Sequence, residues 1–165
     1  MDHSGFAKWM EAYDLAGLAA GEAPPPELRE LASRALVVSS DTVRARLSAE
    51  LLATNVVTSP LLREVALVIP KCGGLRLPMP LWALVIGLRF TYGTHKAEEL
   101  NRARDAARWL AALAAEHGDV VAVTHGAMRR YLAEAFVADG WRAVYPRKRK
   151  WAAWSVWQIV RPVSP

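Results

Sequence analysis

The sequence has 165 residues, of which 53% are hydrophobic and 22% charged, a composition that excludes a disordered chain and favours a globular domain. A formal net charge of +5 favours anionic partners such as phosphate esters, nucleic acid or acidic lipid, without choosing among them. The single cysteine, Cys72, excludes an internal disulfide, and the first residues lack the features of a signal peptide. We therefore expect a cytoplasmic location.

Hydrophobic periodicity and turn residues predict alternating helices and strands along the chain. The predicted helices cover residues 6–18, 27–34, 42–53, 82–90, 94–116 and 127–138. The predicted strands cover residues 35–38, 55–58, 120–124 and 155–161. The apolar runs at 35–38 and 120–124 are typical of strands that are buried on both faces. This alternation predicts an α/β fold, a three-layer α/β/α sandwich with a mostly parallel sheet.

A single domain is expected over residues 1–165, with residues 70–95 as a cap-like insertion. The most apolar stretch, residues 77–90, is shorter than the roughly 20 residues that a membrane-spanning helix needs. It also contains Pro78, Pro80 and Arg89, so we interpret it as a buried or interfacial segment.

Polar residues follow two of the predicted strands, at residues 39–41 (S-S-D) and 124–126 (T-H-G). In open α/β sheets, function is found where parallel strands end. His125 lies between a buried strand and a helix start, where it can hold a phosphoryl oxygen or move a proton, although hydrogen bonding for packing explains it equally well. The oxygens of residues 39–41 are also suited to capping the next helix.

Two charged residues near these strand ends are further candidates. Arg44 lies in the first turn of a predicted helix, where a cation is unfavourable for the helix dipole, and arginine suits bidentate phosphate binding. A solvated surface arginine remains the alternative. Glu64 follows a strand and a turn, and by itself it is indistinguishable from an ordinary exposed glutamate.

Three segments, in order and with matching spacing, resemble the histidine phosphatase (phosphoglycerate mutase-like) superfamily. Residues 37–49, VVSSDTVRARLSA, resemble its S-S-D-x-x-R-A-x-x-T-A segment, and residues 62–64 resemble its L-R-E segment. Residues 121–130, VAVTHGAMRR, resemble the segment V-x-V-S/T-H-G-x-x-x-R that carries its second histidine. The resemblance covers roughly residues 35–138 and implies a phosphoglycerate mutase-like sandwich.

The resemblance also implies phosphomonoester hydrolysis with no metal and no other cofactor. In that family a histidine in an R-H-G motif attacks the phosphoryl group, and water then hydrolyses the phosphohistidine. By similarity, Arg44 and His125 would bind the phosphoryl group, His125 would stabilise the developing charge, and Glu64 would protonate the leaving oxygen. The expected partner is a small phosphorylated substrate or ligand, and a homo-oligomer stays open.

The chain departs from the family at the nucleophile, because R-H-G does not occur in this sequence. His3, the one histidine before Ser39, follows an aspartate and has no strand before it. We expect the family's first strand, a central one, to be missing, so that its two neighbours pair with each other or keep unpaired backbone groups. Two interpretations stay open: an inactive or impaired hydrolase, and a non-catalytic protein that binds a phosphorylated ligand or partner.

A basic and aromatic segment offers a rival function. The run R-K-R-K at residues 147–150 lies between Trp141 and the pair Trp151 and Trp154, a pattern that can hold nucleic acid by phosphate neutralisation and base stacking. We favour a solvated turn with the tryptophans in the core, and so expect no nucleic-acid partner. Membrane association through residues 81–86 is likewise not expected.

Overall fold

The computed structural model describes residues 2–15, 17–18, 21, 23–65, 78, 81–82, 96–144 and 154–162. The basic run at 147–150 and most of the expected cap-like insertion at 70–95 lie outside the described residues. Within the insertion, Trp82 is fully buried and stacks on Phe6, with ring centroids 4.8 Å apart.

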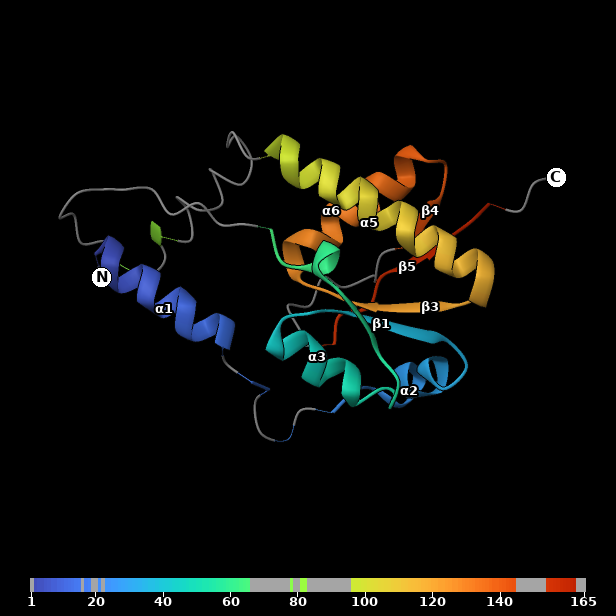
Figure 1. Ribbon diagram of the computed structural model, residues 1–165, viewed down its shortest axis with the longest axis horizontal. Coiled ribbons are helices and arrows are strands. Elements are labelled where there is room, and N and C mark those ends of the chain that lie inside the picture. The colour runs from blue at the N-terminus through green and yellow to red at the C-terminus, as the bar shows by residue number, and fades with distance from the viewer. Residues whose placement is uncertain are drawn as a thin grey trace.

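A parallel sheet forms the centre of the described structure (Figure 1). It contains β1 (Leu36–Ser40), β2 (Val57–Ser59) and β3 (Val120–Val123), in the order β2-β1-β3. Val38 pairs with Val57 on one side and with Ala122 on the other. The strands that residues 39–41 and 124–126 follow are therefore direct neighbours in the sheet.

Helices cover both faces of this sheet, so that the fold is the predicted α/β sandwich (Figure 1). One layer contains α5 (Lys96–His117) and α6 (Gly126–Ala138). The other contains α2 (Pro26–Ala32) and α3 (Val43–Glu50), while α1 (His3–Leu15) lies to one side and contacts α3.

Strand alternation divides the core between the two helical layers. Val38 faces the larger cluster with Met128 and Phe136 of α6, whereas Val37 faces the smaller one with Ala32 and Ala49. Neighbouring residues of a strand point to opposite faces, so a continuous apolar run is what a sheet covered on both sides requires. Val37 and Val38 are 1% and 0% exposed, which confirms that this strand is buried on both faces. The same expectation is wrong for β3, whose four residues are half-buried because it is the outer strand of the described sheet.

The last predicted strand forms outside the parallel sheet. β5 (Gln158–Val160) pairs antiparallel with β4 (Arg142–Val144) in a sheet of two strands. The sequence analysis missed β4 because it has three residues and two of them are exposed. Several helix bounds also differ. For example, α1 begins at His3, where Asp2 accepts the Gly5 amide at 2.8 Å, and α3 ends at Glu50 instead of residue 53.

Candidate functional site

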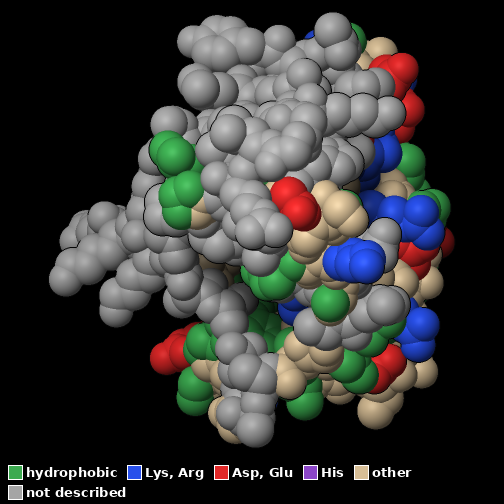
Figure 2. Space-filling model, turned by 90° about the vertical axis from the view of Figure 1, so that its left-hand side faces the viewer, with side chains coloured by type: hydrophobic (Ala, Val, Ile, Leu, Met, Phe, Trp, Pro, Cys, Tyr) green, Lys and Arg blue, Asp and Glu red, His purple; other side chains and the backbone are tan. Residues whose placement is uncertain are grey.

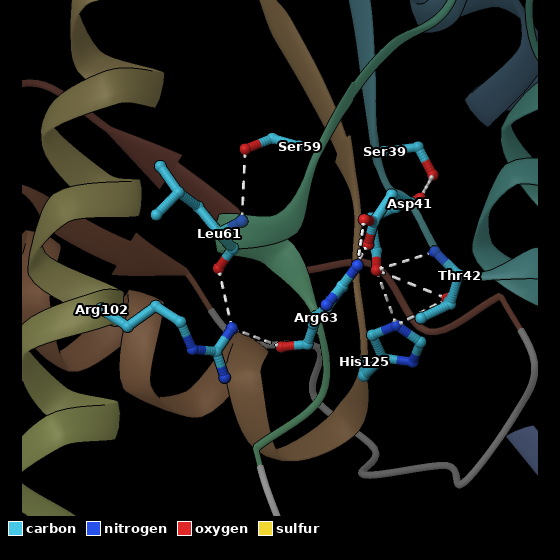
Figure 3. A network of polar contacts seen from close by, with 9 residues as sticks. Ser39, Asp41, Thr42, Ser59, Leu61, Arg63, Arg102 and His125 are labelled. Carbon is cyan, nitrogen blue, oxygen red and sulfur yellow. Dashed lines mark hydrogen bonds and ion pairs between the residues drawn. The ribbon is translucent and has the colours of Figure 1, made fainter.

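A cluster of polar side chains, formed by Ser40, Thr42 and His125, lies where β1 and β3 end (Figure 3). His125 is the N-cap residue of α6, and Thr42 is the N-cap residue of α3. His125 Nε2 lies 3.1 Å from Thr42 Oγ1 and 3.1 Å from Ser40 Oγ. Two helix starts thus meet through their N-cap side chains, because parallel pairing of β1 with β3 places both strand ends at one edge of the sheet.

The start of α3 has no side-chain cap of the usual kind. A threonine at this position normally accepts a hydrogen bond from an amide of the first turn. Thr42 makes no such bond and instead turns its hydroxyl to His125. Ser40 Oγ accepts the amide of Thr42 itself at 3.4 Å, and Ser39 Oγ donates to the Ser40 carbonyl at 2.8 Å. The expectation that residues 39–41 cap the helix is therefore wrong for these serines, which bond inside the turn.

The start of α6, in contrast, is filled by the carboxylate of Glu64. Its Oε1 accepts the amides of Ala127 at 3.1 Å and Met128 at 3.0 Å, and also that of Val65 at 3.0 Å. A negative charge is stabilised there by the exposed amides and by the helix dipole. The anion that the sequence analysis expected at this helix start is thus supplied by the protein itself.

Arg102 of α5 holds the segment that carries Glu64. Its guanidinium donates to the carbonyls of Leu61 at 3.0 Å, Arg63 at 2.8 Å and Glu64 at 3.2 Å. The same guanidinium forms an ion pair with Glu99, whose side chain is 13% exposed. Since three carbonyls share one cation, the segment after β2 is fixed to α5.

The end of β3 contributes a second anchor to this segment. Thr124 Oγ1 donates to the carbonyl of Leu62 at 2.8 Å. Leu62 is fully buried at the end of the short 3-10 helix η1 (Pro60–Leu62), whose start is capped by Ser59 through the Leu61 amide at 3.2 Å. The position of Glu64 is therefore set from both the helical layer and the sheet.

An ion pair lies beside this cluster. Arg63 Nε and Nη2 donate to the two carboxylate oxygens of Asp41 at 2.7 Å and 2.6 Å. The Arg63 guanidinium, with a smaller contribution from the charge of His125, lowers the pKa of Asp41 below its ordinary value. Figure 3 shows the Arg63 side chain pointing toward Asp41 at the end of β1.

The structure brings the predicted site residues to one edge of the sheet. His125 and Glu64 meet at the start of α6, and Arg44 is the second residue of α3, half-buried and two positions after Thr42. The sequence analysis assigned no role to Thr42 or Arg102, and to Ser40 only the capping of the next helix. Threonine beside a helix start is typical of a cap, and arginine three residues after a glutamate is typical of a pair on a helix surface, so neither pattern indicates the observed contacts.

A pocket of about 350 Å³ adjoins the cluster at Asp41. It lies between α3 and the segment of β2, and its walls are Asp41, Arg46, Glu50, Thr54, Val56 and Thr58. The walls carry charges of both signs, so the pocket suits a small polar group.

The described residues contain no group of three His, Cys, Asp or Glu side chains that could hold a metal ion. No helix in the described part of the chain is long and apolar enough to cross a membrane. On the face in Figure 2, basic and acidic side chains of the described residues lie among each other. Trp141, from the proposed nucleic-acid segment, packs edge-on against Phe136 with centroids 5.1 Å apart.

The fold and the cluster define an α/β sandwich with a histidine-centred polar site at the ends of its parallel strands. The sequence matches no family model and no curated protein. The structure is similar to a solved structure named Mycobacterial hydrolase 1, with a TM-score of 0.50 and 26% sequence identity. The similarity covers 68% of this chain and 62% of that one, so this chain matches less than two thirds of that protein.

Proposed function

We propose that this protein is a phosphomonoester hydrolase of the histidine phosphatase type, with its phosphoryl site between the starts of α3 and α6. The observation that carries the proposal is the contact of His125 Nε2 with the hydroxyl of Thr42, which joins two helix N-termini. The amides at the start of α6 are occupied by Glu64, so the start of α3 is the one that favours an anion, and His125 beside it can hold a phosphoryl oxygen and transfer a proton. The similarity to a protein named as a hydrolase supports the reaction class.

In this proposal the helix α3 supplies the positive charge for the phosphoryl group. Arg44 is half-buried in the first turn of α3, on the helix whose N-cap side chain contacts His125. A guanidinium at this place can hold two phosphoryl oxygens and stabilise their charge during transfer. The part of the substrate that leaves would occupy the pocket beside Asp41, which accepts a small polar group.

Glu64 keeps its predicted role as proton donor only if its carboxyl group leaves the amides of Ala127 and Met128. The observed bonds instead suit a carboxylate that caps α6. His125 already contacts a hydroxyl and is half-buried, so in our proposal it is the group that transfers protons at this site.

The test is turnover of p-nitrophenyl phosphate by the full chain and by two matched variants. His125→Ala removes the histidine of the cluster, whereas His117→Ala removes an exposed histidine at the end of α5. We expect the first variant to lose activity by at least about 100-fold and the second to keep it, because a positioned acid–base group contributes about that factor. Thermal unfolding of each variant would confirm that it folds.

A folded wild-type chain without turnover would contradict the hydrolase proposal. The alternative is then a non-catalytic protein that binds a phosphorylated ligand at the start of α3. The bonds of Glu64 to the α6 amides favour the lack of catalysis, because they occupy the predicted proton donor. A rise of the melting temperature with inorganic phosphate, absent in Arg44→Met, would support that alternative.

A further inference from the structure

We propose that Thr42 is the nucleophile of this site and that His125 is its general base, so that phosphoryl transfer proceeds through a phosphothreonine. This inference rests on the proposed function. It goes beyond it because it replaces the family's histidine nucleophile, whose R-H-G motif does not occur in this sequence, with a hydroxyl group of this site.

The first support is the geometry of the hydroxyl and the imidazole. Thr42 Oγ1 and His125 Nε2 are 3.1 Å apart, which is the distance at which a base accepts the proton of a nucleophile. Ser40 Oγ lies 3.4 Å from Thr42 Oγ1 and 3.1 Å from Nε2, and when Ser40 donates to Thr42 the threonine hydroxyl can donate its own proton to Nε2. This arrangement uses the histidine tautomer with its proton on Nδ1.

Exposure distinguishes the two hydroxyl groups that contact His125. Ser40 is 0% exposed, so a substrate cannot reach its oxygen. Thr42 is half-exposed at the start of α3, next to Asp41, which forms part of the pocket wall. Ser40 is therefore a positioning residue, and Thr42 is the hydroxyl group that phosphorus can approach.

The unused cap provides independent support. An N-cap hydroxyl that bonds to its own helix stabilises a protein by about 1 kcal/mol, and the Thr42 side chain makes no such bond. A half-exposed hydroxyl could be hydrated instead, so burial does not require the contact with His125. The side chain bonds to a residue 83 positions away in place of the nearest amides, as expected for a hydroxyl held for chemistry.

The reaction balances with water as the only co-substrate. Thr42 Oγ1 forms a bond to phosphorus while its proton moves to His125 Nε2, and the bond from phosphorus to the leaving oxygen breaks. The leaving oxygen, which lies on the opposite side of phosphorus, departs as an anion and takes a proton from the solvent. In the second half, water attacks phosphorus and loses a proton to the solvent, the bond to Oγ1 breaks, and Oγ1 takes its proton back from His125.

The test combines acid quenching with three variants of the full chain. The chain is mixed with p-nitrophenyl phosphate, quenched in acid, and the covalently bound phosphate is located by peptide mass spectrometry. Phosphothreonine survives acid, whereas phosphohistidine does not. Thr42→Val removes the hydroxyl at similar shape, Thr42→Ser retains it, and Ser48→Ala removes a hydroxyl elsewhere on α3 as the control.

We expect acid-stable phosphate on Thr42, a loss of turnover of at least about 100-fold in Thr42→Val, and activity in Thr42→Ser and Ser48→Ala. Wild-type turnover in a folded Thr42→Val variant would overturn the assignment of Thr42 and leave the proposed function intact. Absence of turnover in the wild type would overturn both, and the two failures are therefore distinguishable.

Discussion

The starts of α3 and α6 lie at the same sheet edge, but the side chains at the two N-termini make different kinds of bonds. At α6, the carboxylate of Glu64 binds two amides of the first turn, and Arg102 fixes the segment that carries it. At α3, the N-cap threonine bonds to no amide of its helix and contacts His125 instead. One helix start is completed by the protein, and the other keeps its N-cap side chain for a partner across the site.

The two helix starts therefore have different roles at one edge of the sheet. The start of α6 stabilises the fold, and the start of α3 serves the proposed chemistry. A carboxylate on helix amides stabilises the fold, because it satisfies donors that would otherwise need water. A hydroxyl held against an imidazole adds little to stability but prepares proton transfer. Substitutions at the two helix starts should therefore affect different observables.

The largest effect should come from removing the anchor of the α6 cap. Arg102→Met removes the donor to the carbonyls of Leu61, Arg63 and Glu64 and also removes the ion pair with Glu99. We expect a loss of about 3 kcal/mol in the free energy of unfolding, measured by urea denaturation. Arg104→Met, on the exposed side of the same helix, is the control and should change stability little. Equal losses in both variants would contradict the anchoring role.

A smaller effect distinguishes the two helix starts directly. Glu64→Gln removes the charge on the α6 amides and should cost about 1 kcal/mol in the free energy of unfolding. Thr42→Val removes a hydroxyl that caps nothing in α3, so it should cost less. Urea denaturation of both variants under one condition measures the difference. A larger loss in Thr42→Val would show that the comparison between the helix starts is wrong.

The smallest effect concerns the ion pair between Asp41 and Arg63 and depends on pH. The pKa of Asp41 is lowered in the folded protein, mainly by Arg63, so its contribution to stability is present above the ordinary value of 3.8. That contribution is lost as the pH falls through the lower, folded value. Arg63→Met should therefore be slightly less stable than the wild type at neutral pH, with the difference disappearing in acid.

Thermal unfolding across pH measures this last effect, and high salt provides its control. The pair is exposed, so added salt should also reduce the difference at neutral pH. A difference that persists at acid pH would mean that Arg63 acts through something other than the charge of Asp41.

Much of the fold follows from the sequence, because its strongest signals are physical requirements of a sheet covered on both faces. The apolar run that forms β1 cannot be placed elsewhere without exposing it, whereas the run that forms β3 is only half-buried at the edge of the described sheet. The short β4 carries no such signal, because three residues of which two are exposed have the same polar pattern as a turn. Its pairing with β5 depends on contacts made only after the chain has folded.

The site was predictable in its position but not in its contacts. Parallel strands fixed where His125 and Arg44 would lie, because the helices after them must begin at the same sheet edge. The bonds of Glu64 to α6 and of Thr42 to His125 join residues more than 60 positions apart. No local pattern encodes such pairs, so propensity could suggest a cap at Thr42 but not the direction of its hydroxyl.

The direct pairing of β1 with β3 also has a consequence for the order in which the protein folds. On the ribosome, β1 and β2 emerge together, but β3 follows only after the whole of α5 has been synthesised. Contacts between parts of the chain so distant in sequence form slowly, because the intervening loop must first be closed. The edge of β1 that pairs with β3 should therefore remain unpaired during synthesis. The contact between Thr42 and His125 should then form in the last steps of folding.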